Sequence, residues 1–159
     1  MEERTDIPTF QQSNLPSAGR LLAVDWGEKR IGVARSDESQ TLAQPLTTLT
    51  RRAGKRFPMR QLVALLETHA VTGVVVGLPL DERGDEGAPA RSARQLAAAI
   101  GRQTGLPVAL WDERFTTARV LAAVREMGGE TRGRKDDVDA LAAALVLQHY
   151  LDARRGGVT

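Results

Sequence analysis

The sequence predicts an α/β domain built on a mixed five-stranded sheet with helices on its faces. Three observations predict this fold class: strand-like runs gather near the start, helical and strand-like periods then alternate, and turn residues separate them. The 159 residues suit one domain, and residues 1–19 are polar and lack a sustained period. We therefore expect a flexible N-terminal tail over residues 1–19 and one domain over residues 20–155.

The first three strands are expected to form an antiparallel meander. Leu21–Val24 is apolar at every position, which is typical of a strand that is covered on both faces, and it ends at Asp25. Residues 27–29 have the composition of a hairpin turn and lead into a second strand over residues 30–36. A third strand is expected over residues 41–49.

The chain then changes to helical spacing. Leucine residues three and four positions apart predict a helix over residues 62–69, and a β-branched run predicts a strand over residues 74–76. A polar loop over residues 81–87 follows. Pro89 is then expected to open an alanine-rich helix, because proline is favoured in the first helical turn.

The last part of the domain should complete the sheet and add two helices. A short strand is expected over residues 107–111, followed by a helix that Thr116 could cap and a final helix over residues 136–151. Right-handed crossovers would place the strands at 74–76 and 107–111 parallel to the first strand. The carboxyl ends of these three strands would then meet at one edge.

Acidic residues gather at this edge. Asp25 ends the first strand, Glu113 follows the last one, and Asp139 lies in the first turn of the final helix. Each alone has an ordinary interpretation as an exposed, ion-paired or helix-capping acid. Together they favour a shared two-metal site for Mg²⁺ or Mn²⁺, since such cations prefer oxygen ligands and two-metal nucleases need several converging carboxylates. We expect Asp25, Glu113 and Asp139 to be the catalytic residues and the metal ligands.

Two adjacent acids, Asp112 and Glu113, are candidates for the same metal ligand. Asp112 and Glu113 should point to opposite sides, because consecutive residues leaving a strand alternate. The longer side chain of Glu113 can reach back to the cations, whereas Asp112 is better placed to hold Arg114 and the turn. Gly32 and Gly77 are expected either to permit close approach of backbone or substrate or to relieve packing.

Basic residues provide a candidate surface for the nucleic-acid backbone, although the net charge is only +2. Arginine is well represented among them, and its planar fork suits phosphate. The alternative interpretation is an ordinary solvated surface. The candidate nucleic-acid-binding residues are Lys29, Arg30, Arg51, Arg52, Lys55, Arg56, Arg114, Arg134 and Lys135.

Other function classes lack their sequence signatures. The phosphate-binding patterns of nucleotide-driven enzymes and dinucleotide-binding dehydrogenases are absent, and His69 and His149 have no recognisable nucleophile partner. The chain has no cysteine, which suits a reducing compartment, and no apolar run of about 20 residues. We therefore expect a cytoplasmic protein that does not enter a membrane.

Five ordered motifs between Leu21 and Leu151 resemble the YqgF/RuvX family, assigned to Holliday-junction resolvase-like or pre-16S rRNA nucleases. They are DWGEKRIGVA at residues 25–34, AQPL at 43–46, VVGLPL at 75–80, WDERFTT at 111–117 and KDDVDALAA at 135–143. The resemblance implies an RNase H-like fold, a divalent cation and phosphodiester hydrolysis. It also places the catalytic acids at Asp25, Glu113 and Asp139.

The resemblance leaves several alternatives open. The family has been linked both to 5′ trimming of precursor 16S rRNA and to cutting branched DNA, and either a monomer or a homodimer would fit. Relatives commonly have an asparagine soon after Leu80, where this chain reads DERGDEG, and Trp26 stands where phenylalanine is usual. The rival functions are a non-catalytic nucleic-acid-binding module and, as the weakest candidate, an actin-like or sugar-kinase-like ATPase.

Overall fold

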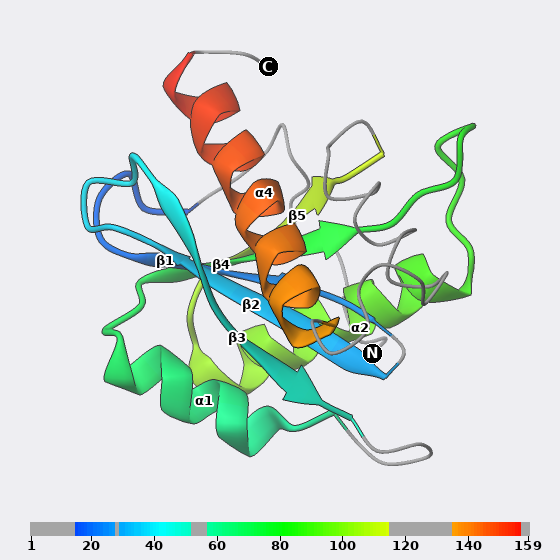
Figure 1. The fold of residues 1–159 in the computed structure, drawn as a ribbon, viewed down its shortest axis with the longest axis horizontal. Helices are drawn as coiled ribbons and strands as arrows, with labels where there is room; N and C mark the ends of the chain where they lie inside the picture. The colour runs from blue at the N-terminus through cyan, green and yellow to red at the C-terminus, as the bar shows by residue number, and fades with distance from the viewer. Residues whose placement is uncertain (1–14, 28, 52–56, 115–134, 157–159) are drawn as a thin grey trace, which may run out of the picture.

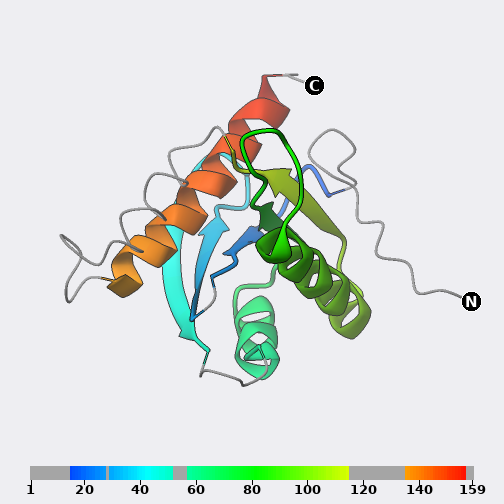
Figure 2. The ribbon, with the colours of Figure 1, turned by 90° about the vertical axis from the view of Figure 1, so that its right-hand side faces the viewer.

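The computed structural model describes residues 15–27, 29–51, 57–114 and 135–156. They form one five-stranded sheet in the order β3-β2-β1-β4-β5, with helices on both faces (Figures 1 and 2). The strands are β1 Leu21–Asp25, β2 Arg30–Ser36, β3 Ala43–Thr50, β4 Gly73–Leu78 and β5 Val108–Asp112. The helices are α1 Met59–Thr68, α2 Ala88–Thr104 and α4 Lys135–Arg155.

The strand directions confirm the predicted mixed sheet. β1, β2 and β3 form an antiparallel meander, and β4 and β5 run parallel to β1. The third strand begins at Ala43, two residues later than expected. The reason is that the backbone amides of Thr41 and Leu42 donate to the carboxylate of Asp37, at 2.7 and 3.2 Å, and so belong to the turn.

Alternating residues of β1 serve two core layers, which explains why this strand is apolar throughout. Leu22 and Val24 pack in the layer that contains residues of α1 and α2. Leu21 and Ala23 pack in the layer that contains α4, which crosses the other face of the sheet (Figure 1). Both layers are buried, so the sheet is a rigid support for whatever its ends carry.

The helix boundaries largely follow the sequence signals. Pro89 lies in the first turn of α2, and Gly105 ends this helix in the left-handed conformation, with φ +75°. The helix expected after Thr116 lies outside the described residues. The described part of the chain contains no helix that is both long and apolar enough to cross a membrane.

The segment before β1, which the sequence assigned to the N-terminal tail, packs against the rest of the fold. Leu15 is buried in the α4 layer of the core. The guanidinium group of Arg154 on α4 donates to the backbone oxygen atoms of Leu15 and Pro16. The side-chain amide of Gln40 also donates to the backbone oxygen of Pro16, at 3.0 Å. The segment that begins at Leu15 is therefore packed against the domain. The sequence pattern did not indicate this, because the segment has only one buried leucine and its hydrogen bonds are accepted by backbone oxygen atoms.

Candidate active site at the carboxyl ends of the parallel strands

The alternation of the strands brings an acid and two glycines to the α4 face of the sheet. Ala23 packs in the α4 layer, so Asp25, two residues further along β1, points to the same face. Gly32 is the register partner of Asp25 on β2. Gly77 on β4 lies one residue beyond the last register pair between β1 and β4. Asp25 is therefore flanked by a glycine on each neighbouring strand.

Glu113 reaches this face from β5. Trp111 packs in the α4 layer, and Glu113 lies two residues further on, just beyond the strand. Its backbone N–H donates to the oxygen of Leu78 at 3.3 Å, which continues the contact with β4. A Cβ atom built on Gly77 would overlap Oε2 of Glu113 and lie 3.5 Å from Oδ1 of Asp25. The two carboxylates therefore converge over Gly77.

The burial of these acids makes their convergence informative. Asp25 is 3% exposed and Glu113 is 7% exposed. Two carboxylates that share a buried volume repel one another, and the repulsion is expensive because little water screens it. An arrangement of this kind is typical of a site that receives a cation.

Asp139 approaches from α4. A Cβ atom built on Gly32 would overlap the backbone oxygen of Asp139, so the helix rests directly on β2 at this glycine. The side chain of Asp139 is completely buried, and its Oδ2 accepts a hydrogen bond of 2.8 Å from Nε of Arg30. Because Gly32 pairs with Asp25 in register, α4 delivers Asp139 to the same end of the same face.

Asp112 has a different environment from Glu113. The carboxylate of Asp112 accepts hydrogen bonds from the backbone N–H of Arg114 at 2.9 Å and from its guanidinium group at 2.8 to 3.3 Å. The hydrogen bond to Asp112 raises the pKa of Arg114. Asp112 thus fixes the turn that carries Glu113, on the opposite side of the strand.

The loop after β4 packs against this turn. Oδ1 of Asp81 accepts hydrogen bonds from the backbone N–H groups of Arg83 and Asp85, at 2.9 and 2.8 Å. The loop contains Gly84 with φ +88°, where a Cβ atom would lie 2.7 Å from Nη1 of Arg114. Arg114, predicted to bind nucleic acid, is therefore held between Asp112 and the loop. The sequence predicted a polar loop but carried no local signal for this contact.

The other candidate basic residues that the structure describes have different environments. Lys29 is exposed, and Arg30 is bonded to Asp139. The guanidinium carbon of Arg51 lies 4.9 Å from the ring centroid of Trp26, which stacks on Phe57 at 6.4 Å. Arg52, Lys55, Arg56 and Arg134 lie outside the described residues, as does the side chain of Lys135.

The three acids provide oxygen donors on one face of the sheet. Within the described residues, no group of three His, Cys, Asp or Glu side chains is close enough to hold an ion as the side chains stand. Asp25 and Glu113 converge, while the carboxylate of Asp139 is engaged by Arg30. All three are oxygen donors on one face, so the residues fit Mg²⁺ or Mn²⁺ by their chemistry.

Comparison with known proteins decides the family. A family model described as RuvX, Holliday junction resolvase, matches residues 19–153. The chain belongs to the RuvX family. The predicted family and the predicted enzyme class, a nuclease, are confirmed.

Two relatives show how evenly the similarity extends over this RuvX-family chain. A protein of Koribacter versatilis is 40% identical over 141 residues, which cover 87% of this chain and 92% of that protein. A protein of Paramagnetospirillum magneticum is 40% identical over 149 residues, which cover 94% of this chain and 96% of that protein. Both are provisionally named pre-16S rRNA nucleases.

A solved structure supports the fold. T. thermophilus RuvC, in complex with a Holliday junction substrate, matches with a TM-score of 0.50 and 18% sequence identity. The match covers 86% of this chain and 96% of that chain. At this identity the similarity concerns the fold alone, and the predicted RNase H-like fold is confirmed.

Proposed function

We propose that this chain is a metal-dependent endonuclease that hydrolyses phosphodiester bonds in structured nucleic acid. The observation that carries the proposal is the convergence of the buried carboxylates of Asp25 and Glu113 over Gly77, with Asp139 on the same face. Membership of the RuvX family supports it. A purely structural role would not require two buried acids to share the space above a glycine.

The three acids would hold Mg²⁺ or Mn²⁺, most simply as a two-metal site. When bound, the cations supply an activated water and stabilise the charge on the leaving oxygen. Asp25 and Glu113 hold their carboxylates at the ends of rigid strands, which fixes the donor positions before the substrate arrives. Arg30 neutralises Asp139 and presents a guanidinium group beside the acids. It is therefore placed both to compensate the buried charge and to contact a phosphate.

Precursor 16S rRNA, cut on its 5′ side, is the substrate that we favour. Relatives that share 40% identity over most of this chain carry the corresponding name. Branched DNA is the second candidate, because the family model is described as a Holliday junction resolvase. Both substrates would place the activity in the cytoplasm. A monomer suits RNA trimming, whereas a homodimer would suit a two-fold symmetric junction.

The basic residues near the acids would position the backbone of the substrate. Lys29 precedes β2 and Arg51 follows β3, at the end of the sheet where β1 ends, and the backbone N–H of Arg51 donates to the oxygen of Lys29 at 2.7 Å. We extend this role to Arg52, Lys55, Arg56, Arg134 and Lys135 from their sequence positions alone. Contacts of this type read phosphate rather than bases, so neutralising them should weaken binding similarly for all sequences and flatten its salt dependence.

The test compares cleavage of two substrates by the purified full chain. Matched four-way DNA junctions and RNAs that carry the 5′ precursor sequence of 16S rRNA are incubated with Mg²⁺, Mn²⁺ or EDTA. Asp25→Asn serves as the inactive variant, and Asp152→Asn, an exposed acid on α4, serves as the control. Metal-dependent cleavage that Asp25→Asn alone loses would support the proposal. Binding without cleavage in every condition would favour the non-catalytic module.

A further inference from the structure

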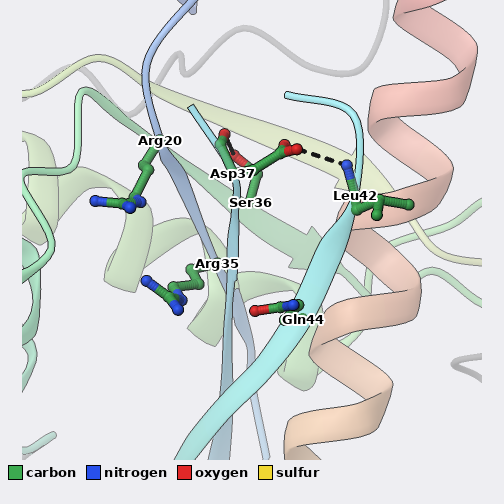
Figure 3. Close-up of a pocket in the computed structure, with 6 residues that line it drawn as sticks. All are labelled: Arg20, Arg35, Ser36, Asp37, Leu42 and Gln44. Atoms are coloured by element: carbon green, nitrogen blue, oxygen red, sulfur yellow. Dashed lines mark hydrogen bonds between the residues drawn. The ribbon is translucent and has the colours of Figure 1, made fainter. Parts of the chain in front are cut away.

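A cavity of about 140 Å³ lies at the other end of the sheet, away from the acids. Arg20 precedes β1 and Arg35 lies near the end of β2, so the cavity is at the start of β1, whereas Asp25 is at its end. Figure 3 shows the residues that line it, which are Arg20, Arg35, Ser36, Asp37, Leu42 and Gln44. The cavity is thus separate from the candidate active site.

Strand register explains why two arginine residues meet here. Arg35 pairs with Leu22 on β1 and with Gln44 on β3, so its side chain lies on the face that carries α1. Arg20 is two residues before Leu22 and shares that face. In Figure 3 the two guanidinium groups extend to the same side of the strands. This face is opposite to the one that carries Asp25 and Glu113.

Neither guanidinium group is neutralised by a carboxylate in the part of the chain that the structure describes. The ion pairs found there involve other arginine residues, and none of their members lines the cavity. They are Arg30–Asp139, Arg94–Glu86, Arg114–Asp112 and Arg155–Asp152. Nε of Arg20 is buried and makes no hydrogen bond within the described residues. Two cations with this little compensation attract an anion.

Asp37 lines the cavity, but its carboxylate is hydrogen-bonded within the turn that precedes β3. Its carboxylate accepts hydrogen bonds from the backbone N–H groups of Thr41 and Leu42 and from the hydroxyl of Ser39. The hydrogen bond from Thr41 is the main cause of the lowered pKa of Asp37. Figure 3 shows the carboxylate turned toward Leu42 and away from the two arginine side chains.

The positive charges of both arginine residues act on the side chain of His69, the residue that follows α1. Its Nδ1 atom lies 3.4 Å from Nη1 of Arg35. Burial lowers the pKa of His69, and the positive charges of Arg35 and then Arg20 lower it further. The neutral ring can accept a hydrogen bond from Arg35, and it would become easier to protonate if an anion screened the arginine charges.

We propose that this cavity binds a phosphate group, held by Arg20 and Arg35 beside His69. Arginine forks match the oxygen atoms of phosphate in pairs, and such charge-assisted hydrogen bonds are about twice as strong as neutral ones. The cavity is several times larger than the roughly 10–15 Å³ that one water molecule requires, so a tetrahedral oxyanion fits. The amide of Gln44 adds a polar group to the same wall.

The phosphate in this cavity is not the one that the acids would cut. Asp25 lies five positions after Arg20, which corresponds to roughly 16 Å along an extended strand, and the two sites occupy opposite faces. The phosphate group can come from a free phosphomonoester or from a distant part of a bound nucleic acid. These sources share the same chemistry and differ in the length of the molecule that carries it.

The first test observes His69 directly by NMR while inorganic phosphate is added to the full chain in EDTA, so that no cation recruits phosphate to the acids. The chain has two histidine residues, which makes His149 an internal control. We expect phosphate to raise the pKa of His69 toward its ordinary value, while the resonances of His149 keep their positions. If the resonances of His69 are insensitive to phosphate and to every longer probe described below, the proposal is wrong.

The second test measures affinity for the same probe by calorimetry. Arg20→Gln and Arg35→Gln should each weaken binding about tenfold or more, since each removes one charge-assisted contact. Arg91→Gln, an exposed arginine of α2, is the control and should bind as the parent does. If a Gln variant does not fold, the corresponding Lys variant keeps the charge and should bind with intermediate affinity. Equal binding by all folded variants would overturn the assignment.

A third arm identifies the source of the phosphate. The parent and Arg35→Gln are each titrated with inorganic phosphate, with adenosine monophosphate and with a single-stranded oligonucleotide of 12 nucleotides (the 12-mer). If the small probes shift His69 as the 12-mer does, the site accepts a free phosphomonoester. If only the 12-mer shifts it, and Arg35→Gln removes that shift, the site holds the backbone of a nucleic acid.

Discussion

The two ends of the sheet differ in the charge that they gather and in how the chain makes room for it. At the carboxyl ends of the parallel strands, Asp25 and Glu113 are buried above Gly77, and α4 brings Asp139 across Gly32. At the opposite end, Arg20 and Arg35 surround an open cavity. The acidic end is closely packed because Gly32 and Gly77 have no side chains and let the acids approach the sheet. The basic end instead contains a cavity.

Each end of the sheet requires a counter-charge of a different kind from outside the chain. Like charges that share a buried volume raise the free energy of the folded state, unless a counter-ion compensates them. The compact acidic end fits a small cation that bonds to several oxygen atoms at once. The hollow basic end fits a larger polyatomic anion.

Removing the charge of Asp25 should have the largest effect. Asp25→Asn keeps the shape of the side chain but weakens its hold on a cation, and it should lower kcat/KM about 1,000-fold or more, since a catalytic cation supplies several kcal/mol. In EDTA the variant should be as stable as the parent or more stable, because one repelling charge is gone. Cleavage assays and thermal unfolding measure the two effects.

The outcomes for Asp25→Asn separate a metal site from a structural one. Full activity would remove Asp25 from the mechanism. A large drop in melting temperature in EDTA would show that the carboxylate stabilises the fold through an ion pair instead. Asp152→Asn should change neither quantity, because Asp152 is exposed.

The neighbouring acids Asp112 and Glu113 should differ in kind. Glu113→Gln should lower kcat about 100-fold or more with little loss of stability, because its carboxylate lies beside Asp25. Asp112→Asn should retain most activity but lower the free energy of unfolding by about 1 kcal/mol, since it weakens the bonds to Arg114. If Asp112→Asn loses as much activity as Asp25→Asn and Glu113→Gln stays active, the assignment is reversed.

The two glycine residues provide a steric version of the same comparison. In Gly32→Ala the new methyl group meets the backbone of α4 at Asp139, which cannot rotate away, so the free energy of unfolding should fall by about 3 kcal/mol. In Gly77→Ala it meets the end of the Glu113 side chain, which can move. Gly77→Ala should therefore cost less stability but weaken cation binding, as chemical denaturation and metal titration would show. Equal losses of stability would contradict this.

Arg30 should compete with the cation at the acidic end. In EDTA, Arg30→Gln should lower the free energy of unfolding by about 2 kcal/mol, because Asp139 is completely buried and loses a charged partner. The stabilisation that added Mn²⁺ gives should then be larger than in the parent. Arg155→Gln breaks an exposed pair on α4 and should cost less than about 0.5 kcal/mol. A Mn²⁺ effect that is unchanged in Arg30→Gln would contradict the competition.

The sheet and its acidic edge could be predicted from the sequence because their signals are local. An apolar strand that ends in Asp25, a hairpin turn and alternating periods sufficed to predict the antiparallel meander of β1, β2 and β3 and the parallel direction of β4 and β5. Alternation also placed Asp112 and Glu113 on opposite sides. The two glycines were expected either to permit close approach or to relieve packing, and the structure shows what lies against each one: the backbone of α4 at Gly32 and a carboxylate at Gly77.

The pairings across the fold could not be predicted, because they depend on register and on the placement of α4. Nothing in the sequence around Arg30 indicated that it bonds to Asp139, 109 positions away. Arg20 and Arg35 are 15 positions apart and share a face only through the pairing of β1 with β2. Leu15 is one apolar residue in a polar segment, so periodicity could not show that it is buried.

The smallest effect should come from His69 at the basic end. Because burial, Arg35 and Arg20 lower the pKa of His69 in the folded state, the unfolded chain binds more protons near and below pH 6.5, the ordinary value for histidine. The contribution of His69 to stability is therefore fully present above pH 6.5 and is lost as the pH falls toward the lowered pKa. His69→Asn should show a weaker loss of melting temperature between pH 7.5 and 5.5 than the parent. If an anion in the cavity screens the arginine charges, added phosphate should weaken the pH dependence of the parent and leave that of His69→Asn unchanged, which ties the smallest prediction to the occupant of the basic end.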